Sequence, residues 1–229
     1  KEVILPSLSF VSTAHAIMYN GGKPVFVDVD VKSLNVNIND LISKISNKTK
    51  AIMLINIHGN SSDIFKIKAI AKKKNIILIE DNCEALGSKL KNKYLGTFGD
   101  FATFSFFYSH QITSGEGGMV VCHNDKDYEI LFALRSHGWM GGTRFYPRSL
   151  KIYRKYAKKY PNLDPRYIFV NSGFNLRPTD IQAAIGLSQF KKLEKFRHIR
   201  SRNRNKIIIN LFKNPKWNNQ FKFIQAPKN

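Results

Sequence analysis

The chain has 229 residues, of which 43% are hydrophobic, 12% aromatic and 23% charged, and this composition excludes disordered, collagen-like and coiled-coil chains. No apolar run approaches the roughly 18 residues of a membrane span, and the first residues lack the pattern of a secretion signal, so we expect a cytoplasmic protein. Cys83 and Cys122 are too few to build a disulfide framework, a structural metal site or an iron–sulfur cluster from the chain's own thiols.

The net charge of +21 is concentrated in the last third of the chain. Residues 1–150 carry a net charge of +5, and residues 151–229 carry +16. Such a basic segment can bind nucleic-acid phosphates, can bind a phosphorylated small molecule, or can be the solvated surface of a lysine-rich chain. It has no nucleic-acid recognition motif, and its aromatic residues are irregularly spaced: Tyr153, Tyr156, Tyr160 and Tyr167. We therefore expect no nucleic-acid partner.

Strand and helix patterns alternate along the first 138 residues. Apolar runs predict strands over residues 3–8, 24–29, 51–57, 76–80, 101–107 and 118–124. Amphipathic patterns predict helices over residues 9–22, 37–46, 61–75 and 125–138, the third of them capped by Ser61 or Ser62. The run AIMLINI at 51–57 lacks polar alternation, which is typical of a strand covered on both faces. This order predicts an α/β fold with a mostly parallel sheet flanked by helices.

The pattern changes after Gly138. Residues 139–175 are rich in Gly, Tyr, Lys, Arg and Pro and only weakly periodic, so we interpret them as a long surface excursion. Its length indicates a role in function or in contact with another subunit. Residues 179–212 predict one long helix or a broken pair of helices.

Polar side chains gather where two of the predicted strands end. The strands over 76–80 and 101–107 lead to these side chains: Asp81, Asn82, Glu84, Ser105, Ser109 and His110. Ligands of open α/β sheets bind beyond the carboxyl ends of the strands. Carboxylates, a hydroxyl and an imidazole at that edge suit acid–base chemistry around an anionic or nitrogenous cofactor. Taken singly, Asp81 is also compatible with a helix cap, and His110 with a core histidine.

Taken together, these segments resemble a known family. The runs VILPSLSFVSTAHAIMYNGGKPVFVDVD, IEDNCEALGSKL, GTFGDFATFSFFYSHQITSGEGGMVV, LRSHGW and FNLRPTDIQAAIGL are similar in order and spacing to the pyridoxal 5'-phosphate (PLP)-dependent nucleotide-sugar aminotransferases. The resemblance covers residues 3 to about 195 and implies the large domain of a fold type I PLP enzyme. It assigns residues 1–195 to this PLP-binding domain, with its N-terminal part missing, and residues 196–229 to a linking helix and the start of a small C-terminal domain.

One position departs from the family pattern. Six residues before the glutamate of GEGG, the aminotransferases have the lysine that binds the cofactor covalently, and this chain has His110. An imidazole cannot form a Schiff base with an aldehyde, although imidazoles take and give protons near neutral pH. The resemblance then implies the branch of the family that removes the C3 hydroxyl of a nucleotide-linked 4-keto-6-deoxyhexose, with His110 as the catalytic residue.

The cysteines bear on the choice between two forms of this branch. One form acts on a CDP-linked sugar and carries a cysteine-ligated iron–sulfur cluster after the histidine, whereas no cysteine follows Cys122 here. The resemblance favours the other form, which acts on GDP-4-keto-6-deoxymannose and uses L-glutamate to convert PLP to pyridoxamine 5'-phosphate. Its 3,6-dideoxysugar product implies lipopolysaccharide O-antigen biosynthesis. Whether the nucleotide is GDP or CDP stays open. Two alternative functions also stay open: a transaminase and a non-catalytic homologue.

The resemblance also implies roles for side chains around the cofactor. It puts Asp81 at the pyridine nitrogen, where its negative charge keeps the ring protonated and electron-withdrawing. Phe10 stacks on the ring in this interpretation, with a plain core phenylalanine as the alternative. Glu84 is expected near the ring hydroxyl, and Ser105 is expected to hydrogen-bond the cofactor phosphate.

Three further residues are implied to bind substrate or to act between subunits. His137, in RSHGW, matches a residue near the amino-acid and sugar subsite, with a helix cap as the alternative. Asn175 and Arg177, in FNLRPTD, match residues that reach the cofactor phosphate or the substrate carboxylate of a neighbouring subunit. The resemblance therefore implies a homodimer with shared active sites, and no bound metal.

Overall fold

The computed structural model describes residues 1–140, 150–164, 167–218 and 221–224. The chain divides into two compact units, of which the first combines Lys1–Val121 with Ile181–Asn229 and the second is Cys122–Asp180. No helix of the described residues is long and apolar enough to cross a membrane.

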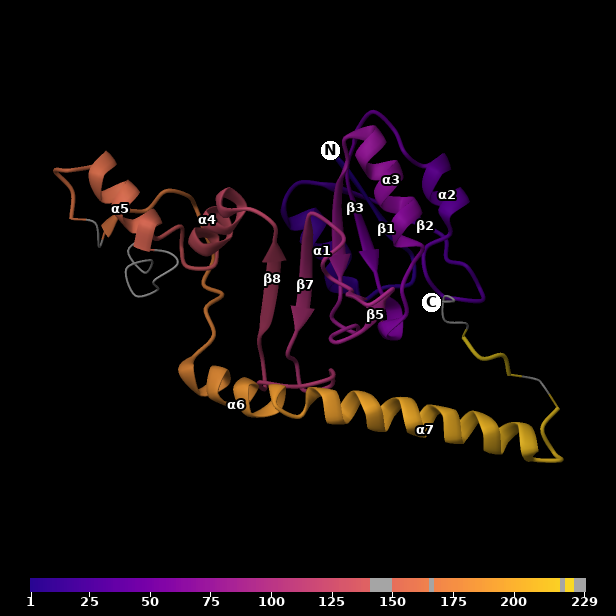
Figure 1. The fold of residues 1–229 in the computed structure, drawn as a ribbon. Helices are drawn as coiled ribbons and strands as arrows, with labels where there is room; N and C mark the ends of the chain where they lie inside the picture. Colours follow the sequence, from indigo (N-terminus) through magenta and orange to yellow (C-terminus); the bar gives the residue numbers. More distant parts are fainter. Residues whose placement is uncertain (141–149, 165–166, 219–220, 225–229) are drawn as a thin grey trace. The chain divides into compact units, whose positions relative to one another are not determined.

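A six-stranded sheet forms the centre of the first unit (Figure 1). Its strands lie in the order β2 (Lys23–Val27), β1 (Glu2–Pro6), β3 (Thr49–Ile55), β4 (Ile77–Asp81), β7 (Phe101–Ser105) and β8 (Gly118–Cys122). The pairs from β2 through β7 are parallel. Figure 1 shows β8 running opposite to β7. The predicted α/β fold with a mostly parallel sheet is confirmed.

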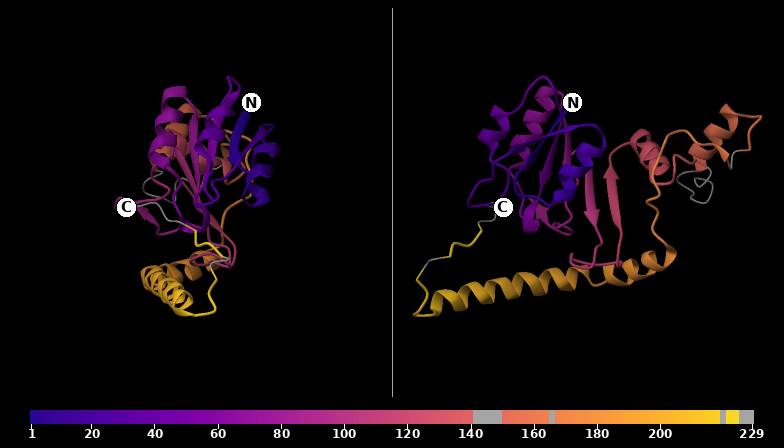
Figure 2. Two further views of the ribbon diagram at one scale, coloured as in Figure 1. Left: turned by 90° about the vertical axis from the view of Figure 1, so that its right-hand side faces the viewer. Right: turned by 180° about the vertical axis from the view of Figure 1, so that it is seen from behind.

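Helices cover both faces of this sheet because successive strand side chains point to opposite faces. On one face, Ile4 and Ile52 belong to a buried cluster with residues of α2 (Ile38–Ser43) and α3 (Ile64–Lys74). On the other face, their neighbours Leu5 and Met53 pack with α1 (Val11–Tyr19). Figure 2 shows α1 in front of the sheet when the molecule is seen from behind. Burial on both faces explains the continuous apolar run of β3.

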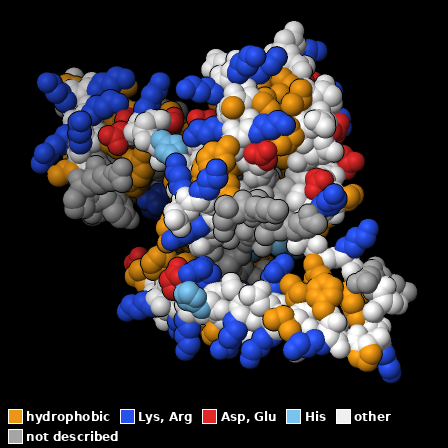
Figure 3. Space-filling model, turned by 45° about the vertical axis from the view of Figure 1, so that its right-hand side comes forward, with side chains coloured by type: hydrophobic (Ala, Val, Ile, Leu, Met, Phe, Trp, Pro, Cys, Tyr) orange, Lys and Arg blue, Asp and Glu red, His pale blue; other side chains and the backbone are white. Residues whose placement is uncertain are grey.

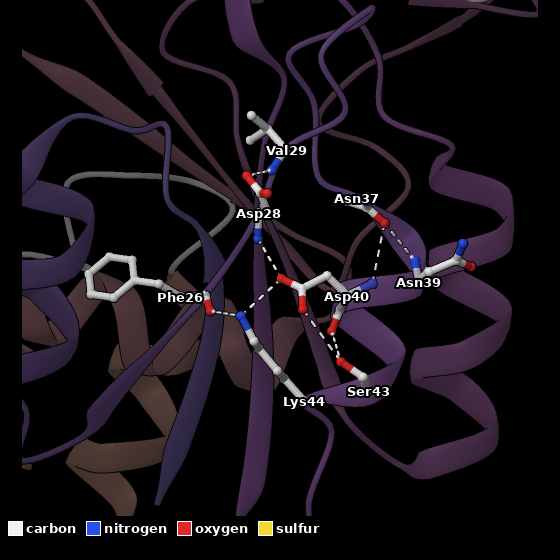
Figure 4. A network of polar contacts seen from close by, with 8 residues as sticks. All are labelled: Phe26, Asp28, Val29, Asn37, Asn39, Asp40, Ser43 and Lys44. Atoms are coloured by element: carbon white, nitrogen blue, oxygen red, sulfur yellow. Dashed lines mark hydrogen bonds and ion pairs between the residues drawn. The ribbon is translucent and has the colours of Figure 1, made fainter.

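Polar contacts fix α2 to the neighbouring strand (Figure 4). The side chain of Asn37 caps α2 by accepting two backbone N–H groups of its first turn. The carboxylate of Asp40 accepts the backbone N–H of Asp28 at 2.6 Å and Lys44 Nζ at 2.9 Å. These contacts, with that of the Asp28 N–H the largest, hold the pKa of Asp40 below its usual value. They fasten α2 to the end of β2.

The predicted cap of α3 was wrong. Asp63 is the cap, and its side chain accepts the backbone N–H of Lys66 at 3.4 Å. Ser61 and Ser62 are both buried, and Ser62 Oγ donates instead to Asn35 Oδ1 at 3.2 Å. A serine near a helix start caps it only when the chain turns into the helix at that serine, and here the turn comes one residue later.

Short elements were not predicted from the sequence. The strands β5 (Lys89–Leu90) and β6 (Lys93–Tyr94) form an antiparallel hairpin, and η1 (Ile57–Gly59) is a 3-10 turn after β3. Strands of two residues are too short to show any period, so only their turn carries a signal. Lys91 and Asn92 occupy that turn with φ values of 48° and 60°, as a two-residue hairpin of this kind requires.

The second unit contains α4 (Asp125–Leu134) and α5 (Leu150–Lys159). The interpretation of 139–175 as a weakly periodic surface excursion missed α5 within it, and 141–149 and 165–166 lie outside the described residues. Ile152 and Tyr156 pack with Ala133 and Met140 in a small core. Tyr156 therefore belongs to the packed side of α5, and the helical pattern was hidden among lysines and arginines.

Two consecutive helices end the first unit. They are α6 (Asp180–Phe190) and α7 (Leu193–Lys213), so the predicted broken pair is confirmed. Basic side chains line α7, which lies at the bottom of Figure 3. The helix α7 continues across residue 195, where the resemblance puts the domain boundary, and that boundary stays a prediction.

Candidate active site

Asp81 lies at the carboxyl edge of the sheet, as the last residue of β4. Its Oδ2 atom accepts a hydrogen bond from Thr13 Oγ1 at 3.3 Å, and its Oδ1 atom accepts the backbone N–H of Cys83 at 3.1 Å. Asp81 is paired in the sheet with Thr103 of β7, so Ser105, two residues farther along, lies beyond it on the same edge. The structure thus brings together the ends of the two strands from which the sequence predicted a site.

A buried polar network supports this edge. Glu80 is 0% exposed, and its carboxylate accepts the backbone N–H groups of Gly96, Phe98 and Gly99 at 2.7–2.8 Å. Asn56 Nδ2 donates to Glu80 at 3.3 Å and to Asn82 Oδ1 at 2.7 Å. Four donors satisfy the Glu80 carboxylate, as burial of a carboxylate requires. Asn82, which the sequence placed among the site candidates, therefore belongs to this supporting network.

Glu84 lies in the turn after β4 and contacts a residue from the end of β3. Its Oε2 atom accepts the backbone N–H of His58 at 2.6 Å and lies 3.1 Å from His58 Nδ1. His58 adopts a left-handed conformation, with φ of 51°. The backbone carbonyl of Glu84 accepts a hydrogen bond from Gln111 Nε2. This last contact joins the segment after Asp81 to the residue that follows His110.

His110 lies in the loop between β7 and β8. Its backbone N–H donates to the carbonyl of Phe107 at 3.1 Å, and its ring is edge-on to the ring of Phe107, with centroids 6.3 Å apart. The side chain is half-buried, so His110 is not part of the fully buried core, and its catalytic role stays a prediction. Ser105 ends β7, and its Oγ atom accepts the backbone N–H of Phe107 at 3.2 Å.

Phe10 immediately precedes α1 and is 77% exposed. The alternative of a core phenylalanine is therefore wrong. The backbone N–H of Thr13 donates to the carbonyl of Phe10 at 3.1 Å, and the side chain of Thr13 contacts Asp81. The exposed ring of Phe10 therefore lies about one helical turn from Thr13, which donates to the Asp81 carboxylate.

His137, Asn175 and Arg177 belong to the second unit. A backbone bridge joins Ser136 to Asn175, and the His137 N–H donates to the carbonyl of Phe174 at 2.7 Å. The guanidinium of Arg177 lies 5.9 Å from the centre of the Trp139 ring. The structure thus places these three predicted residues on two neighbouring segments that are joined by backbone hydrogen bonds. Their assignment to the same site as Asp81 stays a prediction.

The surroundings of Cys83, next to Asp81, disfavour the ionised form of its thiol. Burial, followed by the negative charge of Asp81, raises the pKa of Cys83 to about 12. Cys83 is therefore a neutral thiol at physiological pH and is not suited to nucleophilic or metal-binding chemistry. Within the described residues no cluster of three histidine, cysteine, aspartate or glutamate side chains could hold a metal ion.

Several residues of this edge were not predicted from the sequence. Thr13, His58 and Gln111 contact the segment 81–84 from three separate elements. The Oε1 atom of Gln111 is buried and has no hydrogen-bond partner among the described residues. Only their positions in the sequence could have indicated them. Each of the three lies within three residues of a predicted site residue or of the end of a strand.

The chain is similar to known proteins over most of its length. The chain matches the DegT/DnrJ/EryC1/StrS aminotransferase family over residues 1–223. It is 39% identical over 202 residues to GDP-4-keto-6-deoxy-D-mannose 3-dehydratase of Escherichia coli O55:H7, covering 88% of this chain and 51% of that protein. It is 40% identical over 195 residues to GDP-perosamine synthase of Escherichia coli O157:H7, covering 85% and 48%. The chain thus spans about half the length of these curated relatives.

A solved structure extends the comparison to three dimensions. It is a GDP-4-keto-6-deoxymannose-3-dehydratase with a trapped PLP-glutamate geminal diamine, and it matches with a TM-score of 0.78 and 32% identity over 99% of this chain and 57% of that one. The predicted large-domain fold of the PLP enzymes is therefore confirmed. The polar residues at the strand ends and the match over nearly the whole sequence lead to one conclusion: the chain belongs to the DegT/DnrJ/EryC1/StrS aminotransferase family.

Proposed function

We propose that this chain forms the cofactor-binding part of an enzyme that uses PLP and L-glutamate to remove the C3 hydroxyl of GDP-4-keto-6-deoxymannose. The observation that carries the proposal is a half-buried histidine, His110, in the loop after β7, at the position where the resemblance expects the cofactor-binding lysine. The names of the 3-dehydratase relatives, one of them solved with a PLP-glutamate adduct, support it.

The described residues fit this cofactor. Asp81 offers a half-buried carboxylate whose two oxygens are held by Thr13 and by the Cys83 N–H. Phe10 offers an exposed ring nearby, and Gln111 offers a buried amide oxygen without a partner beside His110. When bound, PLP would supply a protonated pyridine ring that withdraws electrons from the carbon attached to the nitrogen of a bound amino acid.

Each side chain then has a defined task. Asp81 holds the proton on the pyridine nitrogen, Phe10 stacks on the ring, and Ser105 donates to the phosphate. Glu84 lies near the ring hydroxyl. His110 would move a proton between the α-carbon of glutamate and C4′ of the cofactor. In the second half of the reaction it would accept the C4′ proton, which suits a group that exchanges protons near neutral pH.

The second unit supplies residues for the substrate in this proposal. His137 binds near the sugar, and Asn175 and Arg177 contribute to the site of a neighbouring subunit in a homodimer. Their backbones are held together by the Ser136–Asn175 bridge and the His137–Phe174 hydrogen bond, which supports a shared role. A cytoplasmic location, the homodimer and a role in O-antigen biosynthesis stay predictions.

A transaminase is the second candidate, because the match to GDP-perosamine synthase is of equal identity. The test is to incubate the full-length protein with PLP, L-glutamate and GDP-4-keto-6-deoxymannose, with a CDP-linked 4-keto-6-deoxyhexose as control. We expect a 3-deoxygenated sugar, 2-oxoglutarate and ammonia, and no pyridoxyl-lysine after borohydride reduction. An intact amino sugar would support the transaminase, and bound PLP without either product would support a non-catalytic homologue.

A further inference from the structure

We propose that Thr13 is a positioning residue for Asp81: its hydroxyl fixes the orientation of the carboxylate that faces the cofactor and stabilises its charge. The proposal rests on the proposed function, because it assumes that Asp81 binds the pyridine nitrogen of PLP. Thr13 comes from a different element and lies 68 residues away along the chain.

The fold explains how Thr13 reaches Asp81. The strand β1 ends at Pro6 on the carboxyl edge of the sheet, and α1 begins at Val11. Thr13 therefore lies in the first turn of α1, close to that edge. It shares the buried side of the helix with Ala14 and Ile17, which pack against β1 and β3. This packing holds the Thr13 side chain over the end of the sheet.

The direction of the hydroxyl is informative. A threonine within a helix commonly donates to the carbonyl three or four residues earlier. Thr13, which is 3% exposed, donates instead to Asp81 Oδ2 at 3.3 Å. A buried hydroxyl needs a partner, and a carboxylate is a stronger acceptor than a neutral carbonyl.

The two oxygens of Asp81 are thus held by donors from two elements. The Cys83 N–H holds Oδ1 from the turn after β4, and Thr13 holds Oδ2 from α1. Each carboxylate oxygen can accept two hydrogen bonds, so both retain capacity for a ligand. The first turn of α1 also presents the positive end of the helix dipole, which favours a negative charge nearby.

The experiment uses the full-length protein and measures PLP binding. Thr13→Val keeps the shape and removes the hydroxyl, Thr13→Ser keeps the hydroxyl, and Ser12→Ala removes an exposed hydroxyl from the same turn as a control. We expect the Kd for PLP to rise about two- to tenfold in Thr13→Val, because a carboxylate that is no longer held must be ordered when the cofactor binds, and to stay unchanged in the other two variants. The absorbance of bound PLP should also show loss of the ring proton at a lower pH in Thr13→Val, because a carboxylate that is no longer oriented toward the ring nitrogen stabilises that proton less.

The outcomes are distinguishable. If Thr13→Val binds PLP with the wild-type Kd and pH profile, the proposal is wrong. If Thr13→Ser is as impaired as Thr13→Val, the methyl packing matters and not the hydroxyl, and the proposal is wrong as well. If Thr13→Val fails to fold, as judged by its thermal transition without PLP, the Kd for PLP and the pH profile are measured on Thr13→Ala instead and compared with those of Thr13→Ser. A wild-type protein that binds no PLP would instead overturn the proposed function.

Discussion

At the scale of single residues, His110 decides the chemistry that we propose. His110→Asn keeps a side chain of similar shape but cannot exchange protons, so PLP should still bind. The glutamate-dependent conversion of PLP to its pyridoxamine form should fall by about 10²- to 10⁴-fold, the usual contribution of a positioned general base. The absorbance change of the cofactor after mixing with L-glutamate measures this rate. Undiminished conversion would assign the proton transfer to another group, with His137 and Glu84 the nearest candidates.

The two cysteines should differ in reactivity. Burial and the charge of Asp81 raise the pKa of Cys83 to about 12, so at pH 8 only about one Cys83 thiol in 10⁴ is ionised. Thiolates are the reactive form, and raising the pH from 7 to 9 leaves Cys83 almost fully protonated. We expect iodoacetamide to alkylate Cys122 in the native protein and Cys83 only after denaturation, as measured by peptide mass spectrometry. Rapid native labelling of Cys83 would contradict this.

At the scale of elements, the turn after β6 should tolerate no side chain at Gly96. Gly96 has φ of 89°, and a Cβ atom there would lie 2.4 Å from the Phe104 ring and 3.0 Å from Asn82 Nδ2. Its N–H also donates to Glu80. Gly96→Ala should therefore lower the free energy of unfolding by about 3 kcal/mol, from backbone strain and overpacking together.

Gly115 provides a matched control for this prediction. It has a similar φ of 84°, but a Cβ atom there would meet nothing within 4 Å. Gly115→Ala should cost only the backbone strain, about 1 kcal/mol. Urea unfolding of both variants measures the difference. Equal losses would show that the space around Gly96 adjusts to the added methyl group.

At the scale of the whole molecule, the predicted homodimer can be tested by complementation. Arg177→Ala and His110→Asn proteins should each be inactive in dehydration, since each damages both sites of its own dimer. After mixing and subunit exchange, a hybrid dimer should contain one intact site if Arg177 acts across the subunit boundary. We expect about a quarter of wild-type activity, measured as dehydrated sugar. No recovery after confirmed exchange would argue against a shared site.

Local patterns limited what could be predicted about the elements. The long strands and helices of the first unit could be predicted because their apolar periods extend over five or more residues. The helix α5 was missed because its few apolar residues lie among the five lysines and arginines of residues 151–159. The cap of α3 was assigned to the wrong residue because serine and aspartate cap equally well in sequence terms, and only the chain path selects Asp63.

Local patterns and single positions were enough to predict the α/β class, the two polar strand ends and the replacement of a lysine by His110. Three other features became visible in the folded chain alone: Thr13 contacts Asp81, Glu80 accepts donors from the turn at Gly96–Gly99, and Phe10 is exposed. Such contacts join residues far apart in the chain, and they depend on which strands are neighbours and on where each helix crosses the sheet, which no local period specifies.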